Sequence, residues 1–99
     1  MGQISTSKWA GSLYQTQYDA NLTTLGPNHD LTALTLQNLA LIDAVQGRLD
    51  AAKHKFGDVL RVYKIAYQDD HPRVLAAQTN YASLLQQIEE ATELKHNDA

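Results

Sequence analysis

Four histidines are the side chains best suited here to hold a metal ion or to move a proton. His29 and His71 each stand where an apolar periodic segment begins, a place where a side chain caps and packs a helix. His54 lies between two lysines, and His96 is close to the end of the sequence. Zinc sites on a helix pair two His at i and i+4 with a carboxylate, and no two His have this spacing. We therefore expect no metal site.

A group of carboxylates near the end of the sequence is the next candidate for chemistry: Glu89, Glu90, Glu93 and Asp98. Charge runs of this kind usually form a solvated helix face rather than a desolvated catalytic site. The chain has no Cys, so it offers neither a thiolate nucleophile nor a disulfide. It also has no glycine-rich phosphate loop. We expect a protein that is not an enzyme and that binds no cofactor.

The first residues match the M-G-x-x-x-[ST] pattern of N-myristoylation, with Gly2 as the acceptor and Thr6 at the hydroxyl position. A single acyl chain anchors a protein only reversibly, and Lys8 alone is no polybasic second signal. A Gly after the initiator Met is also a common result of recombinant expression. The pattern therefore predicts, at most, a reversible lipid anchor on Gly2.

Composition limits the remaining functions. The 8 basic and 11 acidic residues give a net charge of −3, whereas binders of nucleic acid or of anionic membranes carry a basic excess. No apolar run approaches the length of a membrane span, and no signal-peptide core lies near the start. At 99 residues and 43% hydrophobic, the chain fits one globular domain. We expect a cytoplasmic protein.

Apolar residues recur at steps of three and four, which predicts amphipathic helices, and no segment alternates with the period of a strand. Gly26-Pro27, Gly47 and the segment 69–72 interrupt this pattern. The fold class is therefore all-α, and the short links predict antiparallel neighbours. The expected helices lie near 7–24, 29–46, 48–67 and 71–95. The expected domain is 8–95, between flexible segments 1–7 and 96–99.

The sequence repeats itself with an offset of 42 residues. The pairs are His29 with His71, Asn38 with Asn80, Ala40 with Ala82, Tyr14 with Phe56, Ala20 with Val62 and Leu25 with Tyr67. A unit of this length made of two antiparallel helices is a helical-hairpin repeat. Gly47 would form the turn inside the unit. Ala40 and Ala52 would lie where its two helices approach most closely, and Leu49 and Phe56 would fill the space between adjacent hairpins.

Three segments carry a family resemblance: Leu25-Gly-Pro-Asn-His29, Leu36-Gln-Asn-Leu-Ala-Leu-Ile42 and Gln46-Gly-Arg-Leu-Asp-Ala-Ala52. They resemble the tetratricopeptide repeat of kinesin light chain type, with its LGPxH turn, LNNLALLY helix, QGRY turn and EA pair. The resemblance covers nearly all of 9–94, with one complete repeat at about 30–67. It implies a fragment of a right-handed α-solenoid of about four helices. The family's Gly is missing at position 89, so we expect one long last helix; the alternative is a frayed end after about Ile88.

The resemblance also implies a concave, peptide-binding face. Asn38 and Asn80 match the position where family members clamp a peptide backbone; alternatively, these side chains only stabilise the stack. No Lys or Arg falls on the expected face, which favours a neutral or mildly apolar ligand. The implied partner-binding residues are Gln37, Asn38, Leu41, Val45, Thr79, Asn80, Ser83 and Gln87.

Two functions are compatible with these observations. The first is a non-catalytic adaptor or scaffold that binds a peptide or helix of a partner protein. The second is a structural subunit whose helix faces mediate homo-oligomerisation or packing into a larger complex. Repeat arrays need about three units to bury a continuous core, and this chain has at most two. Either the four helices close into a bundle, or the end faces find a partner.

Overall fold

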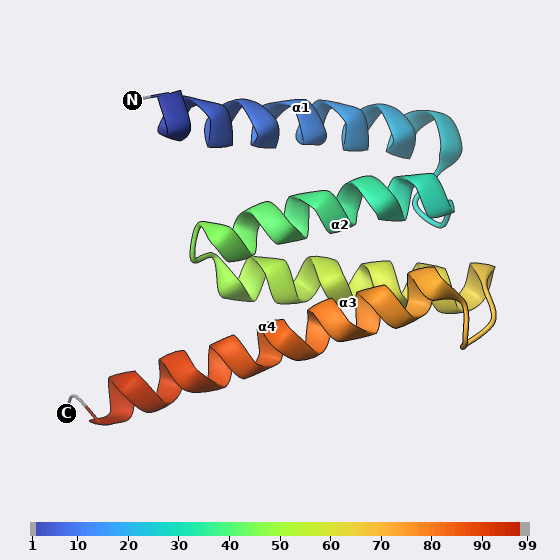
Figure 1. Ribbon diagram of the computed structural model, residues 1–99. Coiled ribbons are helices and arrows are strands. Elements are labelled where there is room, and N and C mark those ends of the chain that lie inside the picture. The colour runs from blue at the N-terminus through green and yellow to red at the C-terminus, as the bar shows by residue number, and fades with distance from the viewer. Residues whose placement is uncertain (1, 98–99) are drawn as a thin grey trace.

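A computed structural model describes the backbone of residues 2–97 and the side-chain burial of residues 11–94. Within the described residues all regular structure is helical (Figure 1). The four helices are α1 (Gly2–Leu25), α2 (Asp30–Val45), α3 (Leu49–Ala66) and α4 (Pro72–Asn97). The predicted all-α class is confirmed.

The helix bounds follow the expected ranges closely, with one clear exception. α2, α3 and α4 each begin within one residue of the predicted position, and α4 runs unbroken past Glu89 to Asn97. α1 begins at Gly2, whereas its expected start is near residue 7. The expected tail 96–99 extends into residues outside those described. The single long last helix is therefore confirmed over the described residues.

As the spacing predicted, a glycine follows the end of α1 and of α2, and a histidine precedes the start of α2 and of α4. Gly26 and Gly47 have φ of 90° and 85°, the left-handed region that closes a helix C-terminus. At the following starts, Nδ1 of His29 accepts the Leu31 N–H at 3.1 Å, and Nδ1 of His71 accepts the Arg73 N–H at 3.0 Å. Each imidazole thus satisfies one of the backbone donors that a helix N-terminus leaves without a partner.

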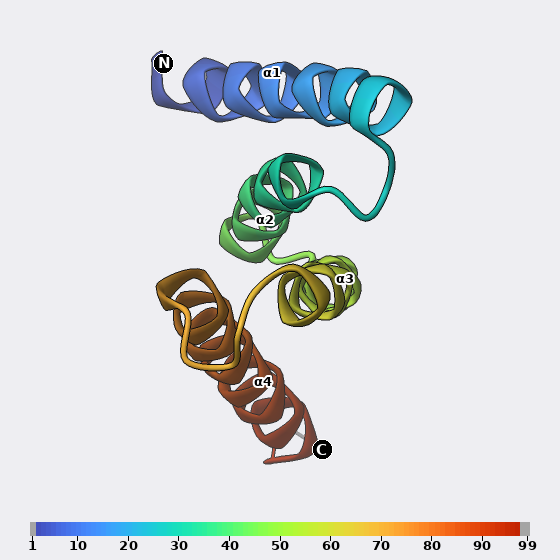
Figure 2. The same ribbon diagram turned by 90° about the vertical axis from the view of Figure 1, so that its right-hand side faces the viewer.

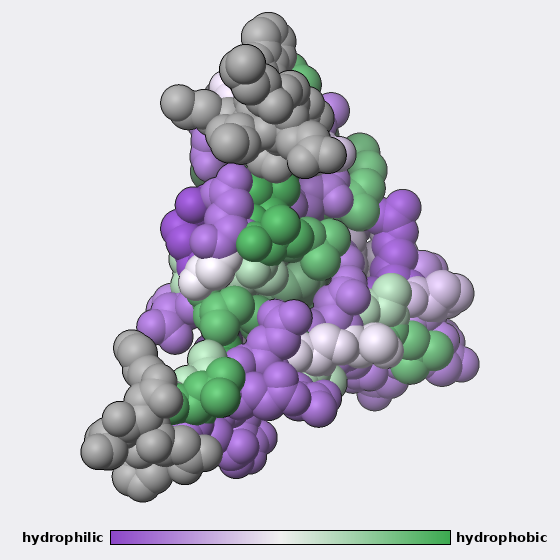
Figure 3. Space-filling view, turned by 60° about the vertical axis from the view of Figure 1, so that its left-hand side comes forward, coloured by the Kyte–Doolittle hydropathy of each residue, from purple (hydrophilic) through white to green (hydrophobic). Residues whose placement is uncertain are grey.

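The helices form a thin, open stack in which each packs mainly on its neighbours in the chain. α3 is covered by α2 on one side and by α4 on another, while α1 contacts chiefly α2 (Figure 2). The stack measures 47 × 37 × 19 Å. The described helices do not close into a bundle, because the main contacts join only helices that are adjacent in the chain. Hydrophobic surface consequently remains exposed in the middle of the molecule, between polar regions (Figure 3).

The core lies along α3, where α2 and α4 pack on it, and consists of two buried clusters. One joins Ala40 of α2 and Ala52 and Phe56 of α3 to Leu84 of α4. Ala40 and Ala52 are completely buried in this cluster, between α2 and α3. The second cluster contains Ala33, Val59, Val62, Tyr63, Val74 and Ala77. The same helix therefore supplies the largest side chains to both clusters.

Gly57 offers a test of this packing. It lies inside α3, and a Cβ added there would meet no atom within 4 Å. We expect Gly57→Ala to raise the free energy of unfolding by about 0.5–1 kcal/mol, because alanine restricts the unfolded chain and favours the helix. Gly47→Ala is the matched control. Its positive φ should make that substitution destabilising by about 1 kcal/mol or more. Urea unfolding measures both, and a destabilised Gly57→Ala would contradict the described environment.

Candidate partner-binding groove

A groove opens between α2 and α4, with α3 beneath it. Its volume is about 210 Å³. Leu41 and Val45 are exposed on its α2 side, and Phe56 of α3 is buried at its base. The residues that line this α2–α4 groove are Leu41, Ala44, Val45, Phe56, Asn80, Ser83, Leu84 and Gln87.

Five of the eight residues implied by the family resemblance come together in this groove: Leu41, Val45, Asn80, Ser83 and Gln87. Gln37, Asn38 and Thr79 are not among its lining residues. Thr79 is exposed on α4, and its hydroxyl donates to the Leu75 carbonyl at 3.0 Å. The two repeat-related asparagines therefore differ, because Asn80 lines the groove and Asn38 is half-buried outside it.

Three lining residues were missed by the sequence argument: Ala44, Phe56 and Leu84. Phe56 was assigned to the space between adjacent hairpins, and its contact with Leu84 in one buried cluster agrees with that role. The signal that could have identified them is the apolar stripe itself, because a groove between two helices exposes part of the core beneath. None of the lining residues is ionisable, so hydrogen bonding there comes from amide and hydroxyl groups.

An ion-pair cluster fixes the end of α2 against α3, close to the groove. Asp43 lies in α2, and its side chain is only 8% exposed. The Arg48 guanidinium donates to Asp43 Oδ1 at 2.9 and 2.7 Å, and Lys55 Nζ donates to Oδ2. Burial raises the pKa of Asp43, but the hydrogen bonds from Lys55 and Arg48 outweigh it and hold the pKa below its ordinary value. The charged carboxylate thus belongs to the folded structure.

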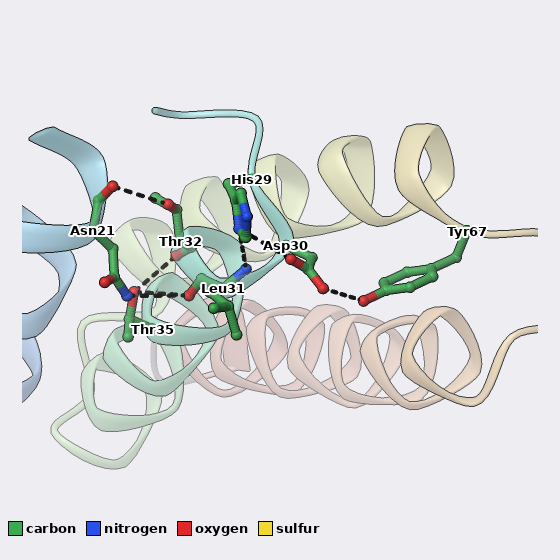
Figure 4. Close-up of polar contacts among 7 residues, drawn as sticks. All are labelled: Asn21, His29, Asp30, Leu31, Thr32, Thr35 and Tyr67. Atoms are coloured by element: carbon green, nitrogen blue, oxygen red, sulfur yellow. Dashed lines mark hydrogen bonds and ion pairs between the residues drawn. The ribbon is translucent and has the colours of Figure 1, made fainter. Parts of the chain in front are cut away.

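A second polar cluster joins the beginning of α2 to the end of α3 (Figure 4). The Tyr67 hydroxyl donates to Asp30, and this hydrogen bond is the main cause that lowers the pKa of Asp30. The Tyr67 ring also stacks on His71, with ring centroids 4.0 Å apart. Tyr67 therefore ties the N-termini of α2 and α4 to α3.

General acid–base catalysis uses side chains of the types found at His29, Asp30 and Tyr67. Here their hydrogen bonds cap the start of α2 and join it to the end of α3. His29 Nδ1 lies 3.0 Å from Asp30 Oδ1 and accepts the Leu31 N–H. Beside it, Asn21 of α1 donates to the Leu31 carbonyl at 3.4 Å, and Thr32 donates to the Asn21 carbonyl at 3.3 Å (Figure 4). The cluster thus connects three helices.

Three other expectations concern metal, membrane and lipid. In the part of the chain that the structure describes, no three His, Asp or Glu side chains lie together as a metal site. Over the same residues, no helix combines the length and the apolar character needed to cross a membrane. The surroundings of Gly2, the predicted lipidation site, lie outside the residues whose side chains are described.

The Asp43 cluster predicts a pH dependence of stability. A carboxylate whose pKa is lowered by folding contributes stability above its ordinary pKa near 3.8, and the contribution is lost as the pH falls through the folded pKa. We expect Asp43→Asn to cost about 1–2 kcal/mol at neutral pH. That difference from the parent chain should shrink below about pH 4.

Thermal melting monitored by circular dichroism between pH 7 and pH 2 measures this effect. Asp58→Asn is the control, because Asp58 is exposed and lies 4.0 Å from Arg61, an arrangement that contributes little. A constant difference between Asp43→Asn and the parent at every pH would show that the ionised carboxylate is not what stabilises this turn.

The chain matches no protein-family model and no curated protein. The tetratricopeptide resemblance therefore rests on the quoted motifs and on the 42-residue repeat. It enters the functional argument as a proposal.

Proposed function

We propose that this chain is a non-catalytic interaction module, a cytoplasmic adaptor of tetratricopeptide-like hairpins that binds a peptide or helix of a partner protein. One observation carries the proposal. Five residues chosen from the sequence, two on α2 and three on α4, line one groove with Phe56 at its base. Residues from separate helices thus meet at one groove, on whose α2 side Leu41 and Val45 are exposed.

The groove's size and chemistry favour a peptide over a small-molecule substrate. Sites for drug-sized ligands have volumes of about 300–1,000 Å³, whereas this groove measures about 210 Å³. That space suits an anchoring side chain of a longer ligand. Leu41 and Val45 would contact an apolar side chain, and Asn80 can both donate to and accept from a peptide backbone. The preferred ligand is a segment with an aliphatic anchor and little charge.

A second function is supported by a different observation. The outer faces of α1 and α4 are exposed, with Leu13 64% and Leu75 50% accessible. Such surfaces favour packing of the chain into a homo-oligomer or a larger complex. In that case the α2–α4 groove would not be the working surface.

Peptide selection from a random library displayed on phage tests the first function, with the complete chain as bait. We expect selected peptides to share an aliphatic anchor and to shift the amide resonances of groove residues on titration. Asn80→Ala should weaken their binding about tenfold, equivalent to about 1.4 kcal/mol. Asn38→Ala is the matched control at the repeat-related position and should bind normally, because Asn38 does not line the groove.

Two further variants separate loss of binding from loss of structure. Ser83→Arg places a charged side chain in the groove and should abolish binding. Ile65→Glu changes a residue of α3 that is 72% exposed and away from the groove, and it should have no effect. Both should keep the parent's helicity. Peptides that bind Ser83→Arg as well as the parent chain would disprove the groove as the binding site.

A further inference from the structure

The 42-residue repeat relates the two halves of the stack in space as well as in sequence. α2 begins at Asp30 and α4 at Pro72, and both are capped in the same manner by His29 and His71. α4 packs on α3 as α2 packs on α1. α2, however, carries a further helix on its other side, namely α3, whereas α4 is the last helix of the stack. One face of α4 therefore corresponds to the α2 face that contacts α3.

This open face of α4 consists of Leu75, Gln78, Ala82 and Leu85, which correspond to Ala33, Leu36, Ala40 and Asp43 of α2. Ala33 and Ala40 are buried against α3, while Leu75 is 50% and Leu85 38% exposed. The difference follows from the packing of α4, because none of the described helices lies on it in the place that α3 occupies on α2.

α1 has the complementary open face. It consists of Leu13, Gln17, Ala20 and Thr24, which correspond to Lys55, Val59, Val62 and Ala66 of α3. Val59 and Val62 are buried in a cluster with Ala33 of α2, whereas Leu13, Gln17 and Ala20 are exposed around a shallow hollow. The open face of α1 thus corresponds to the α3 face that covers α2. It is the kind of surface that could cover the open face of α4.

We propose that a second copy of the chain covers the open face of α4 with its own α1, repeating the α2–α3 contact between two molecules. This inference makes the second candidate function specific and does not depend on the α2–α4 groove. The contact is heterologous, because α1 and α4 are different surfaces, so it can join copies head to tail.

The polar contacts between α2 and α3 support this pairing. The residues that occupy the corresponding positions on the open faces of α4 and α1 are also compatible with each other. Lys55 and Asp43 form an ion pair between α3 and α2. Their counterparts on the open faces are Leu13 and Leu85, which would form an apolar pair. A charged pair inside the molecule thus corresponds to two leucines on the open faces, and burial of their apolar surface would favour the contact.

A second polar contact changes in the same way. The Tyr67 hydroxyl donates to Asp30, and the corresponding positions hold Leu25 and Pro72. Leu25 is an exposed leucine at the end of α1, and Pro72 is exposed at the start of α4. Both interhelical pairs are therefore polar inside the molecule and apolar at its two ends.

The lengths of the end helices agree with the same arrangement. α1 has 24 and α4 26 residues, compared with 16 in α2 and 18 in α3. In an antiparallel pair, the extra turns at the start of α1 and at the end of α4 would lie side by side. The exposed Glu89, Glu90 and Glu93 would then lie near the N-terminus of a helix that has no acidic residue in its own first turn.

One pair opposes the contact. Arg61 donates to Asn28 at 3.1 Å between α3 and the segment before α2. The corresponding residues are Asp19 and Asp70, two exposed carboxylates that would repel each other. Gln17 and Gln78, which correspond to the apolar Val59 and Leu36, also bury less apolar surface than their internal counterparts. We therefore expect a reversible association that strengthens with added salt, which screens the Asp19–Asp70 repulsion.

Two complementary variants test the pairing in the complete chain by analytical ultracentrifugation. Leu13→Glu blocks the face of α1, and Leu85→Glu blocks that of α4. We expect the parent's average mass to rise with concentration above 11.0 kDa, and each variant alone to be monomeric. Their equimolar mixture should form a heterodimer that grows no further, because only one unblocked α1 and one unblocked α4 remain.

Three controls make the result specific. Ile65→Glu alters an exposed residue outside both open faces, so it should associate like the parent. Leu13→Lys combined with Leu85→Asp recreates the Lys55–Asp43 pair and should associate again. Asp19→Arg should tighten the association at least several-fold. All variants should keep the parent's thermal unfolding.

A parent chain that stays monomeric at millimolar concentration would overturn the inference, as would association that survives in Leu13→Glu or Leu85→Glu. Neither result would affect peptide binding in the α2–α4 groove, which Asn80→Ala and Ser83→Arg test separately. Loss of peptide binding in those two variants, with association unchanged, would likewise leave the pairing of α1 with α4 intact.

Discussion

The rest of the structure depends on the packing of α3 between α2 and α4. Phe56 is buried where the three helices meet, in contact with a cluster that includes Ala40, Ala52 and Leu84. Two small alanines and the large Phe56 ring pack together in this cluster of α2, α3 and α4 residues. Without this contact α2 and α4 would have no common support. α3 therefore positions the two helices that form the walls of the α2–α4 groove.

The repeat preserves the helix starts more strictly than the contacts between helices. His29 and His71 cap α2 and α4 through the same atom and the same backbone position, because a helix N-terminus always presents the same unsatisfied donors. Contacts across helices have no such requirement. An ion pair, a hydrogen bond or two apolar side chains can join corresponding positions, provided that each group finds a suitable partner. The open faces of α1 and α4 can therefore carry side chains that differ from those at the corresponding positions of α3 and α2.

Local signals in the sequence predict the parts of the structure that are governed locally. Glycines, capping histidines and the uninterrupted stripe of α4 are such signals, because each acts within a few residues. The starts of α2, α3 and α4 followed from them, whereas the start of α1 did not. The Asp43 cluster could not be predicted, because Asp43 and Lys55 are twelve positions apart and only the packed turn brings them together. The same holds for the choice between a bundle and an open stack, which depends on interhelical angles that periodicity does not specify. Part of the groove was predictable only through the tetratricopeptide resemblance, which implied five of its lining residues, whereas its base belongs to the core.

The two proposed surfaces of α4 do not compete for the same side chains. With 100° between successive residues, Asn80, Ser83 and Gln87 lie on one side of the helix. Leu75, Ala82 and Leu85 lie on the opposite side, and the buried Val74 and Ala77 occupy the side between them. A copy packed on the open face would thus leave the groove accessible. Association would also place further grooves along one stack, and a partner with several binding segments would gain from their proximity. Peptide binding and head-to-tail pairing are therefore compatible in one molecule, and the geometry of α4 is the reason.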